Sequence, residues 1–303
     1  MIQIQHEHLD KLTQNHYEAI ANYLGQKKIE TFDALIAKDF SSEYSFKKIL
    51  LAKPNELREL KQLFKGDKED YNIFKTYYNY LNSYKDVKFY LFGAEASDSE
   101  RERVDYNAYK LVKDLNISTC PYCNRGTIYN LQKSKGRTSE IDHFYPKGKY
   151  PYFAISFYNL IPSCKVCNKL KMEDEVTIHP YEKGFEQTNF KLKVKDSSFY
   201  HSVDGFDLEF KSEDSKINEQ IEIFKLDDLY QNHKDIILEL IQKEAIYNES
   251  YLDELLTQYE GTLFKNKEDL QRLIGGGYIS DEEIGKRPLS KLIKDISKEL
   301  GLI

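Results

Sequence analysis

The four cysteines of this sequence form two pairs with the same spacing, Cys120 with Cys123 and Cys164 with Cys167. A gap of two residues lets both sulfurs of a pair reach one metal ion, and four thiolates complete a tetrahedral shell that suits Zn²⁺. Such a closed shell leaves no position for a substrate. We therefore predict a structural zinc ion bound by all four cysteines, in preference to a redox dithiol, which would need only one pair in a thioredoxin-like setting.

Several polar residues lie close to the two cysteine pairs. Asp142 and His143 are adjacent and fall between the pairs, Asn159 follows them, and Asn168 comes directly after the last cysteine. An Asp-His pair alone is more often an ordinary surface or core histidine with its partner. The combination with two asparagines and a predicted zinc site is far more specific, and it indicates a catalytic segment.

The segment from Cys120 to about Lys171 resembles an HNH nuclease motif held by zinc knuckles, the ββα-metal fold. The resemblance implies that Asp142 binds a catalytic metal and that His143 is the general base. It implies that Asn159 is the central asparagine, which holds the loop that orients His143. Asn168 occupies the place of the final histidine of the motif and would be the second metal ligand.

Asn168 departs from the histidine that gives the family its name. An amide oxygen in place of an imidazole favours Mg²⁺ or Mn²⁺ over Zn²⁺ at the catalytic centre. An unperturbed imidazole is largely neutral at pH 7, so His143 could take a proton from an attacking water. Lys147, Lys149 and Lys171 are candidates for contacts with neighbouring phosphates, although each could equally be a solvated lysine.

The layout also resembles HNH proteins of bacterial defence systems, including PtuB-type proteins of Septu. The shared residues are Asp-His-Phe-x-Pro-Lys from Asp142, Asn-Leu at Asn159, Ser-Cys-x-x-Cys-Asn ending at Asn168, and Lys171. This resemblance implies an ATPase as a partner protein. The glycine run at residues 275–277 is not followed by Gly-Lys-Ser/Thr and is no Walker A motif, so nucleotide hydrolysis would come from another chain.

Positive charge is concentrated in the same segment. Residues 120–173 hold nine Lys or Arg and three acidic residues, a balance of +6 in a chain whose formal net charge is −6. The remainder of the chain is therefore at −12. A basic segment in an acidic protein is suited to contact a polyanion at one place, although an ordinary solvated surface would have the same composition.

The apolar spacing before residue 115 is mostly helical. Stripes at Leu9–Leu24, after Pro54, at Phe74–Tyr84 and at Val104–Leu115 each follow the helical period, and Ser97 and Ser99 have the spacing of capping boxes. We interpret the aromatic stripes as core. The histidines outside the motif with no partner visible in the sequence are taken as ordinary: His6, His8, His16, His201 and His233.

The period changes to two after Phe190. Apolar residues alternate over 190–194 and 206–210, with Asp204-Gly205 as a turn, which predicts a β-hairpin. Helical spacing resumes near Ile217 and continues through three further stripes, at residues 236–241, 252–256 and 289–300. The glycine run at 275–277 is expected to be a flexible break before the last of them.

These patterns predict an α+β protein that is mostly helical and contains a small ββα-metal motif with structural zinc. The predicted domains are an N-terminal helical region (1–115), an HNH domain (116–185), a β-hairpin (186–215) and a C-terminal helical region (216–303). We find no signal peptide and no apolar run long enough for a membrane span, so a cytoplasmic location is expected.

The predicted function is metal-dependent endonucleolytic hydrolysis of DNA, as an effector of defence against phage. Two alternatives stay open. The same site could cut RNA, such as tRNA, because the chemistry acts on the phosphate and other regions select the strand. The chain could also be a noncatalytic zinc-knuckle module that binds nucleic acid or protein, although such a module has no need of Asp142, His143 and both asparagines.

Overall fold

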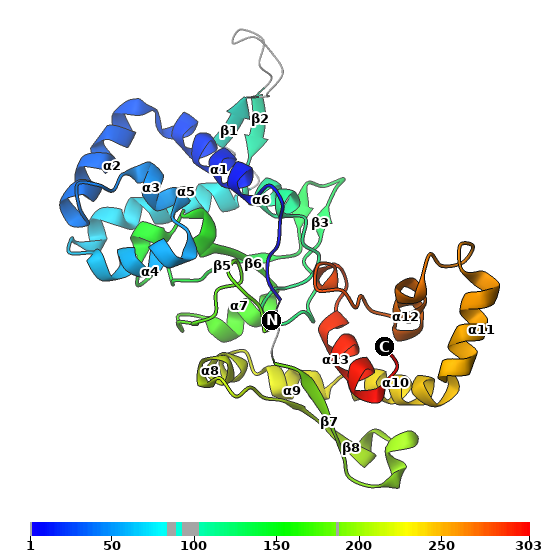
Figure 1. The fold of residues 1–303 in the computed structure, drawn as a ribbon. Coiled ribbons are helices and arrows are strands. Elements are labelled where there is room, and N and C mark those ends of the chain that lie inside the picture. Colours follow the sequence, from blue (N-terminus) through cyan, green and yellow to red (C-terminus); the bar gives the residue numbers. More distant parts are fainter. Residues whose placement is uncertain (1, 84–88, 93–102, 186–187) are drawn as a thin grey trace. The chain divides into compact units, whose positions relative to one another are not determined.

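The computed structural model describes residues 2–83, 89–92, 103–185 and 188–303. It confirms an α+β architecture that is mostly helical, with short two-stranded antiparallel sheets among the helices (Figure 1). In the part of the chain that the structure describes, no helix combines the length and apolar character that crossing a membrane requires.

The chain divides into two compact units, each assembled from separate segments. The first, here called the hairpin unit, comprises Met1–Gln3, Ser118–Thr127 and Val176–Ile303. The second, here called the site unit, comprises Ile4–Ile117 and Ile128–Glu175. The four consecutive domains expected from the sequence stay a prediction.

The helices of the site unit begin where the sequence supplies caps. Pro54 opens its helix, and the Glu56 side chain accepts a hydrogen bond from the backbone N–H of Lys53 at 2.7 Å. The Asn107 side chain accepts from the N–H of Lys110 and so caps the helix that leads to the first cysteine pair. The α-helices of this unit before Ile117 are α1 (Leu9–Leu24), α2 (Gln26–Asp39), α3 (Phe46–Leu51), α4 (Pro54–Leu63), α5 (Asn72–Asn82) and α6 (Ala108–Leu115).

The predicted aromatic stripes form the core of the site unit. Phe74 and Tyr71 are fully buried, and the ring of Tyr152, from a later segment, packs 4.3 Å from that of Phe64. Aromatic pairs at such distances contribute beyond the apolar area that they bury. The core therefore joins the N-terminal helices to the segment around Tyr152, which precedes Asn159 in the chain.

One prediction in this region is wrong. Val104 was assigned to the helix that runs to Leu115, but it lies in strand β2 (Arg103–Tyr106), which pairs with β1 (Phe89–Phe92). The helix starts only after the Asn107 cap, and Tyr106, which pairs with Phe89, is buried in the sheet. The predicted capping boxes at 97 and 99, and Tyr84, lie outside the described residues.

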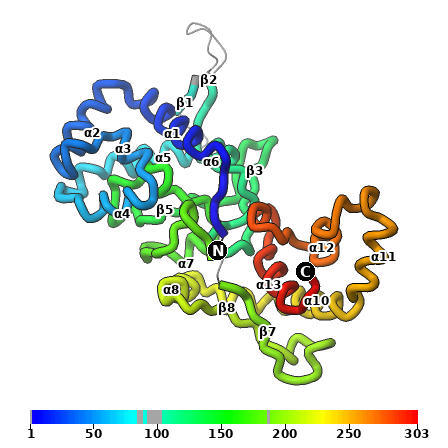
Figure 2. The backbone as a smooth tube through the Cα atoms, in the orientation of Figure 1, coloured from blue at the N-terminus to red at the C-terminus, as the bar shows by residue number. Residues whose placement is uncertain are grey.

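The predicted hairpin is confirmed in the hairpin unit. Strand β7 (Phe190–Val194) pairs with β8 (Phe206–Phe210) in the register Phe190↔Phe210 (Figures 1 and 2). The connection is longer than the predicted turn, because 3₁₀ turns occupy Ser197–Tyr200 and Val203–Gly205. Gly205 is required there, since a Cβ would come within 2.3 Å of the backbone nitrogen of Phe199.

The α-helices of the hairpin unit are α8 (Ser215–Ile223), α9 (Leu226–Gln231), α10 (Lys234–Ile246), α11 (Glu249–Tyr259), α12 (Lys267–Gly275) and α13 (Ser290–Leu300) in the part of the chain that the structure describes. The sequence predicts helices in the regions of α8, α10, α11 and α13, but it does not single out α9 or α12. Helix α13 packs on β7, where the Asp295 carboxylate accepts a hydrogen bond from the N–H of Phe190 at 3.0 Å. This bond satisfies a backbone donor of β7.

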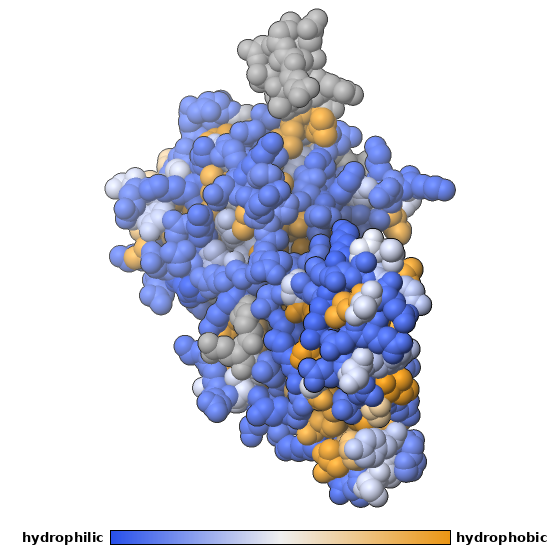
Figure 3. Space-filling model, turned by 45° about the vertical axis from the view of Figure 1, so that its right-hand side comes forward, coloured by the Kyte–Doolittle hydropathy of each residue, from blue (hydrophilic) through white to orange (hydrophobic). Residues whose placement is uncertain are grey.

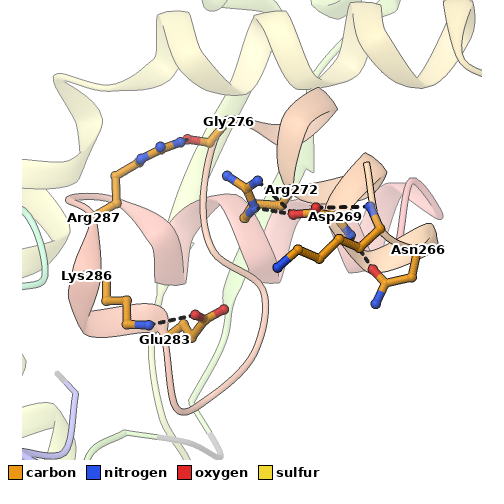
Figure 4. Close-up of polar contacts among 8 residues, drawn as sticks. Asn266, Asp269, Arg272, Gly276, Glu283, Lys286 and Arg287 are labelled. Atoms are coloured by element: carbon orange, nitrogen blue, oxygen red, sulfur yellow. Dashed lines mark hydrogen bonds and ion pairs between the residues drawn. The ribbon is translucent and has the colours of Figure 1, made fainter. Parts of the chain in front are cut away.

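The glycine run has a defined conformation between α12 and α13. Helix α12 ends at Gly275, and Gly276 takes a left-handed backbone with φ of 79°. The Arg287 guanidinium donates to the Gly276 carbonyl at 2.7 Å, and Arg272 pairs with Asp269 at 2.7 Å (Figure 4).

The face shown in Figure 3 is mostly hydrophilic, with separate apolar patches.

Candidate functional site

The predicted catalytic residues lie on strand β5, in the 3₁₀ turn before strand β6 and on helix α7. Strand β5 (Glu140–His143) pairs antiparallel with β6 (Leu160–Ser163), so that Asp142 lies opposite Ile161. Helix α7 (Lys165–Lys171) follows β6 directly and packs against β5. The order along the chain is thus strand, strand, helix, all within the site unit.

Asn159 holds the connection between β5 and β6. Its side chain is fully buried, and its Oδ1 accepts from the N–H of Tyr145 at 2.7 Å. Its Nδ2 donates to the carbonyls of Tyr145 and Phe153, at 3.1 and 2.9 Å. Because an amide offers both an acceptor and two donors, one side chain fixes both ends of the loop.

His143 has a defined tautomer. Its Nε2 lies 3.0 Å from the carbonyl oxygen of Ala154, which can only accept, so Nε2 carries the proton and Nδ1 carries the lone pair. Burial, followed by the nearby charge of Lys147, lowers the pKa of His143 to about 3. The imidazole is therefore neutral at physiological pH, the form that can accept a proton.

Lys171 is fully buried and bound to the same strand. Its Nζ lies 3.3 Å from Asp142 Oδ1 and donates to the carbonyl of His143 at 2.7 Å. Sequence reasoning offered Lys171 as a phosphate contact, and the structure gives its ammonium group these two partners. A carboxylate has two oxygens with several lone pairs, so Asp142 can serve both a lysine and a metal ion.

The other predicted residues lie around this pair. Asn168 precedes Lys171 by three positions on α7, so both are on the face of the helix that packs on β5. Lys147 is half-buried, and its Nζ lies 4.3 Å from the centre of the Tyr78 ring. Lys149 is exposed and donates to the Glu173 carbonyl at 2.8 Å.

Helix α5 contributes residues that sequence reasoning missed. Tyr78 packs its ring 4.4 Å from that of His143 and donates to the carbonyl of Ile141 at 3.3 Å. Lys75 lies one turn earlier on the same face, and its charge is among the causes that lower the pKa of Lys147, after burial. The stripe at 74–84 indicated only core, because nothing in a helical period distinguishes a ring that packs on a histidine.

The first cysteine pair lies in a tight turn of the hairpin unit. The N–H groups of Arg125 and Gly126 each donate to the sulfur of Cys123 at 3.4 Å. Asn124 follows with a left-handed backbone, and its side-chain oxygen accepts from the N–H of Lys291 on α13 at 2.9 Å. N–H donors directed at a sulfur favour its thiolate form, which is the form that binds metal.

The second pair begins helix α7. Cys164 is the N-cap residue, and its sulfur accepts from the N–H of Cys167 at 3.5 Å. All four cysteines are buried, and their sulfurs lie within 4.8 Å of one another. Zinc–sulfur bonds of about 2.3 Å require sulfurs a little under 4 Å apart, so this cluster fits a structural metal such as zinc.

Two characterised proteins are similar to parts of the chain. Protein ea31 of Escherichia phage lambda is 42% identical over 69 residues, which make up 20% of this chain and 20% of the relative. Septu protein PtuB of Bacillus thuringiensis is 30% identical over 99 residues, which make up 30% of this chain and 37% of PtuB. The similarity to PtuB agrees with the resemblance seen in the sequence, but it spans well under half of that protein.

No known family profile matches the chain, and no solved structure matches it.

Proposed function

We propose that this chain is a metal-dependent endonuclease of the HNH type. The observation that carries the proposal is the buried pair Asp142–His143 on β5, in which the imidazole is neutral and oriented by the Ala154 carbonyl. Burying two polar side chains where a strand could bury apolar ones costs stability. A catalytic role for the pair accounts for that cost.

Each neighbouring residue has a role in this proposal. His143 Nδ1 takes the proton from the attacking water, and Asn159 holds the loop that fixes the imidazole. Asp142 and Asn168 supply oxygen ligands for Mg²⁺ or Mn²⁺. A divalent ion bound there would neutralise charge on the phosphate and on the departing 3′ oxygen. Lys147, Lys149 and Lys75 would contact neighbouring phosphates.

Lys171 has a different proposed role from the other lysines. Its ammonium group binds Asp142 Oδ1 and the backbone carbonyl of His143, which fixes the Asp142 carboxylate relative to the backbone of β5. The burial of Lys171 excludes direct access of solvent to Nζ in this state. We therefore assign it to positioning Asp142, with a phosphate contact as the alternative expected from the sequence.

DNA is the substrate that we favour, and defence against phage is the proposed context. The partial similarity to Septu protein PtuB supports the context. The resemblance to PtuB-type proteins further suggests an ATPase as partner. An RNA endonuclease with the same site is the second candidate, and a noncatalytic zinc-knuckle module is the third.

A cleavage assay tests the proposal. The purified protein, with and without Mg²⁺, is offered plasmid DNA, single-stranded DNA and total RNA, alongside His143→Ala. Metal-dependent cleavage of DNA that is lost in the variant supports the proposal, and cleavage of RNA alone favours the second candidate. A variant at a buried histidine of the hairpin unit, His179→Gln, is the matched control. Binding of nucleic acid without cleavage, also in the presence of an ATPase encoded beside the gene, would favour the noncatalytic module.

A further inference from the structure

His16 on helix α1 is a buried histidine outside the predicted motif. It is fully buried, its Nε2 lies 2.8 Å from the carbonyl oxygen of Ile155, and its Nδ1 lies 3.1 Å from the hydroxyl of Tyr106. Since a carbonyl only accepts, Nε2 carries the proton and Nδ1 accepts from the Tyr106 hydroxyl. The Ile155 carbonyl thus sets the tautomer of His16, and the Tyr106 hydroxyl on strand β2 holds the other side of the ring.

Three consecutive carbonyls of the loop are held by three buried side chains. Asn159 donates to the carbonyl of Phe153, His143 to that of Ala154, and His16 to that of Ile155, at 2.9, 3.0 and 2.8 Å. The donors come from different parts of the site unit: a turn before β6, strand β5 and helix α1.

This sequence of bonds fixes the direction of the Ala154 carbonyl. The peptide groups on either side of it are both held, by Asn159 at the Phe153 carbonyl and by His16 at the Ile155 carbonyl. If the Ile155 bond is lost, the backbone around Ile155 can rotate, and the acceptor that orients His143 moves with it. Catalytic groups tolerate little displacement, since a shift of about 1 Å can cost a hundredfold in rate.

We propose that His16, with its ring held by Tyr106, is a positioning residue that orients the His143 imidazole through the Ala154–Ile155 segment. This proposal rests on the proposed endonuclease function, for which His143 is the base. Residues of helix α1 and strand β2, which lie outside the sequence motif, thus help to position the proposed catalytic base. An ordinary core histidine would contribute to stability only.

Two amide substitutions at His16 distinguish a positioning role from a contribution to stability alone. In His16→Gln the side-chain nitrogen takes the place of Nε2 and can still donate to Ile155, whereas in His16→Asn it takes the place of Nδ1 and cannot. Both variants keep a polar amide in the same buried site. The measurement is the tautomer of His143, read from long-range ¹H–¹⁵N spectra of the zinc-loaded, histidine-labelled chain, with His143→Gln identifying the signal.

We expect His143 to be a pure Nε2–H tautomer in the unsubstituted chain and in His16→Gln, and to become a mixture in His16→Asn. In the cleavage assay, kcat of His16→Asn should fall about tenfold to a hundredfold, with KM nearly unchanged, and His16→Gln should recover most of it. A folded His16→Asn with the original His143 spectrum would overturn the proposal.

If His16→Asn does not fold, Tyr106→Phe carries the test. It removes only the hydroxyl that donates to His16 Nδ1 and holds the ring against the Ile155 carbonyl, and we expect a displaced His143 signal. An unchanged signal there would also overturn the proposal. The spectra are recorded without substrate, so they report on positioning whether or not the protein cuts nucleic acid. Absence of cleavage by the unsubstituted chain, also in the presence of the ATPase, would refute the endonuclease function and leave the positioning result standing.

Discussion

Two antiparallel strand pairs of this protein are built on opposite plans. In β7–β8 the burial alternates along β8, and aromatic rings meet across the pair, with Phe190 stacked 4.0 Å from Phe210. In β5–β6 burial does not alternate, since all of β6 and most of β5 are inside, and the buried residues include Asp142 and His143. The buried aromatic side chains of β7–β8 stabilise the fold, whereas the buried polar groups of β5–β6 lower its stability.

The difference teaches where function can be sought. Burying Asp142, His143 and the ammonium group of Lys171 in place of apolar side chains gives up roughly 1.5–3 kcal/mol of stabilisation per side chain. Each of these polar groups must in addition be satisfied by a hydrogen bond or an ion pair. Asp142 pairs with Lys171 of helix α7, and His143 donates to the Ala154 carbonyl. Asn159, helix α7 and the cysteines next to β6 tether the strand pair to the rest of the chain. Perturbing these tethers should therefore affect β5–β6 and spare β7–β8.

Removal of zinc is expected to have the largest effect. Structural zinc supplies roughly 10–16 kcal/mol in zinc-finger peptides, and Cys164 directly follows β6. Chelation should release one zinc per chain and abolish the hydrogen-exchange protection of β5, β6 and α7, while β7 and β8 lose less. Cys164→Ser should behave in the same way. Full protection of β5 and β6 in the metal-free chain would break the comparison.

His143→Ala should reduce the cleavage rate far more than its loss of stability explains. Removing a general base typically lowers the rate about 10²–10⁴-fold, while the lost ring and the unpaired Ala154 carbonyl should lower the melting temperature of a chain that still folds. Cleavage rates and thermal melts of the same preparations check this. A variant with full cleavage would remove His143 from the mechanism.

Lys171→Met should show the cost of the buried charges. Breaking a buried ion pair leaves Asp142 uncompensated and costs about 3–5 kcal/mol. Replacing both partners, in Asp142→Leu with Lys171→Met, should restore much of the stability, because two apolar side chains avoid desolvation. The double variant should remain inactive. Urea denaturation of the single and double variants measures the recovery, and a double variant no more stable than the single one would contradict the idea.

In the β7–β8 hairpin we expect a substitution to lower stability without lowering the cleavage rate. Phe210→Ala removes a buried ring that stacks on Phe190 and contacts Tyr230, and such changes cost about 3–5 kcal/mol. The site lies in the other unit, so the rate at a temperature where the variant is folded should be unchanged. A rate loss as large as that of His143→Ala would show that the two strand pairs are not independent.

The sequence predicted these two regions to different depths. The hairpin was predictable, because alternating apolar residues over 190–194 and 206–210 specify which face is buried. Its register was not, since the connection is longer than the predicted Asp204-Gly205 turn. The polar residues of β5 were found through motif resemblance, since no hydrophobic period marks them. Val104 was misplaced because a helical stripe extends by chance into a strand that pairs with distant residues.

The supporting residues of the site could not be predicted at all. His16, Tyr78 and Tyr106 are far from the motif in the chain, and each acts by a bond to a backbone carbonyl or to a ring that only the fold brings near. Sequence spacing carries no signal for such contacts. The interpretation of His16 as an ordinary histidine had none of these contacts to draw on, and the positioning role proposed above is what tests it.

The smallest expected effect concerns pH. Burial lowers the pKa of His16 to about 4, against 6.5 for an unperturbed imidazole, so the unfolded chain binds a proton that the folded chain does not. The stability that this difference represents is complete above pH 6.5, falls as the pH drops from 6.5 to 4, and is gone below 4. A shift of this size corresponds to about 3 kcal/mol.

His16→Gln cannot titrate, so its free energy of unfolding should fall less steeply over that window. The comparison of the two proteins isolates His16, because His143, whose pKa is also lowered by burial, and the zinc-binding thiolates are common to both. Urea denaturation at half-unit steps from pH 4 to 8 measures the difference. Parallel curves would mean that the folded chain binds the proton of His16 as readily as the unfolded chain does, and the neutral imidazole whose Nδ1 accepts from Tyr106 would then have to be abandoned.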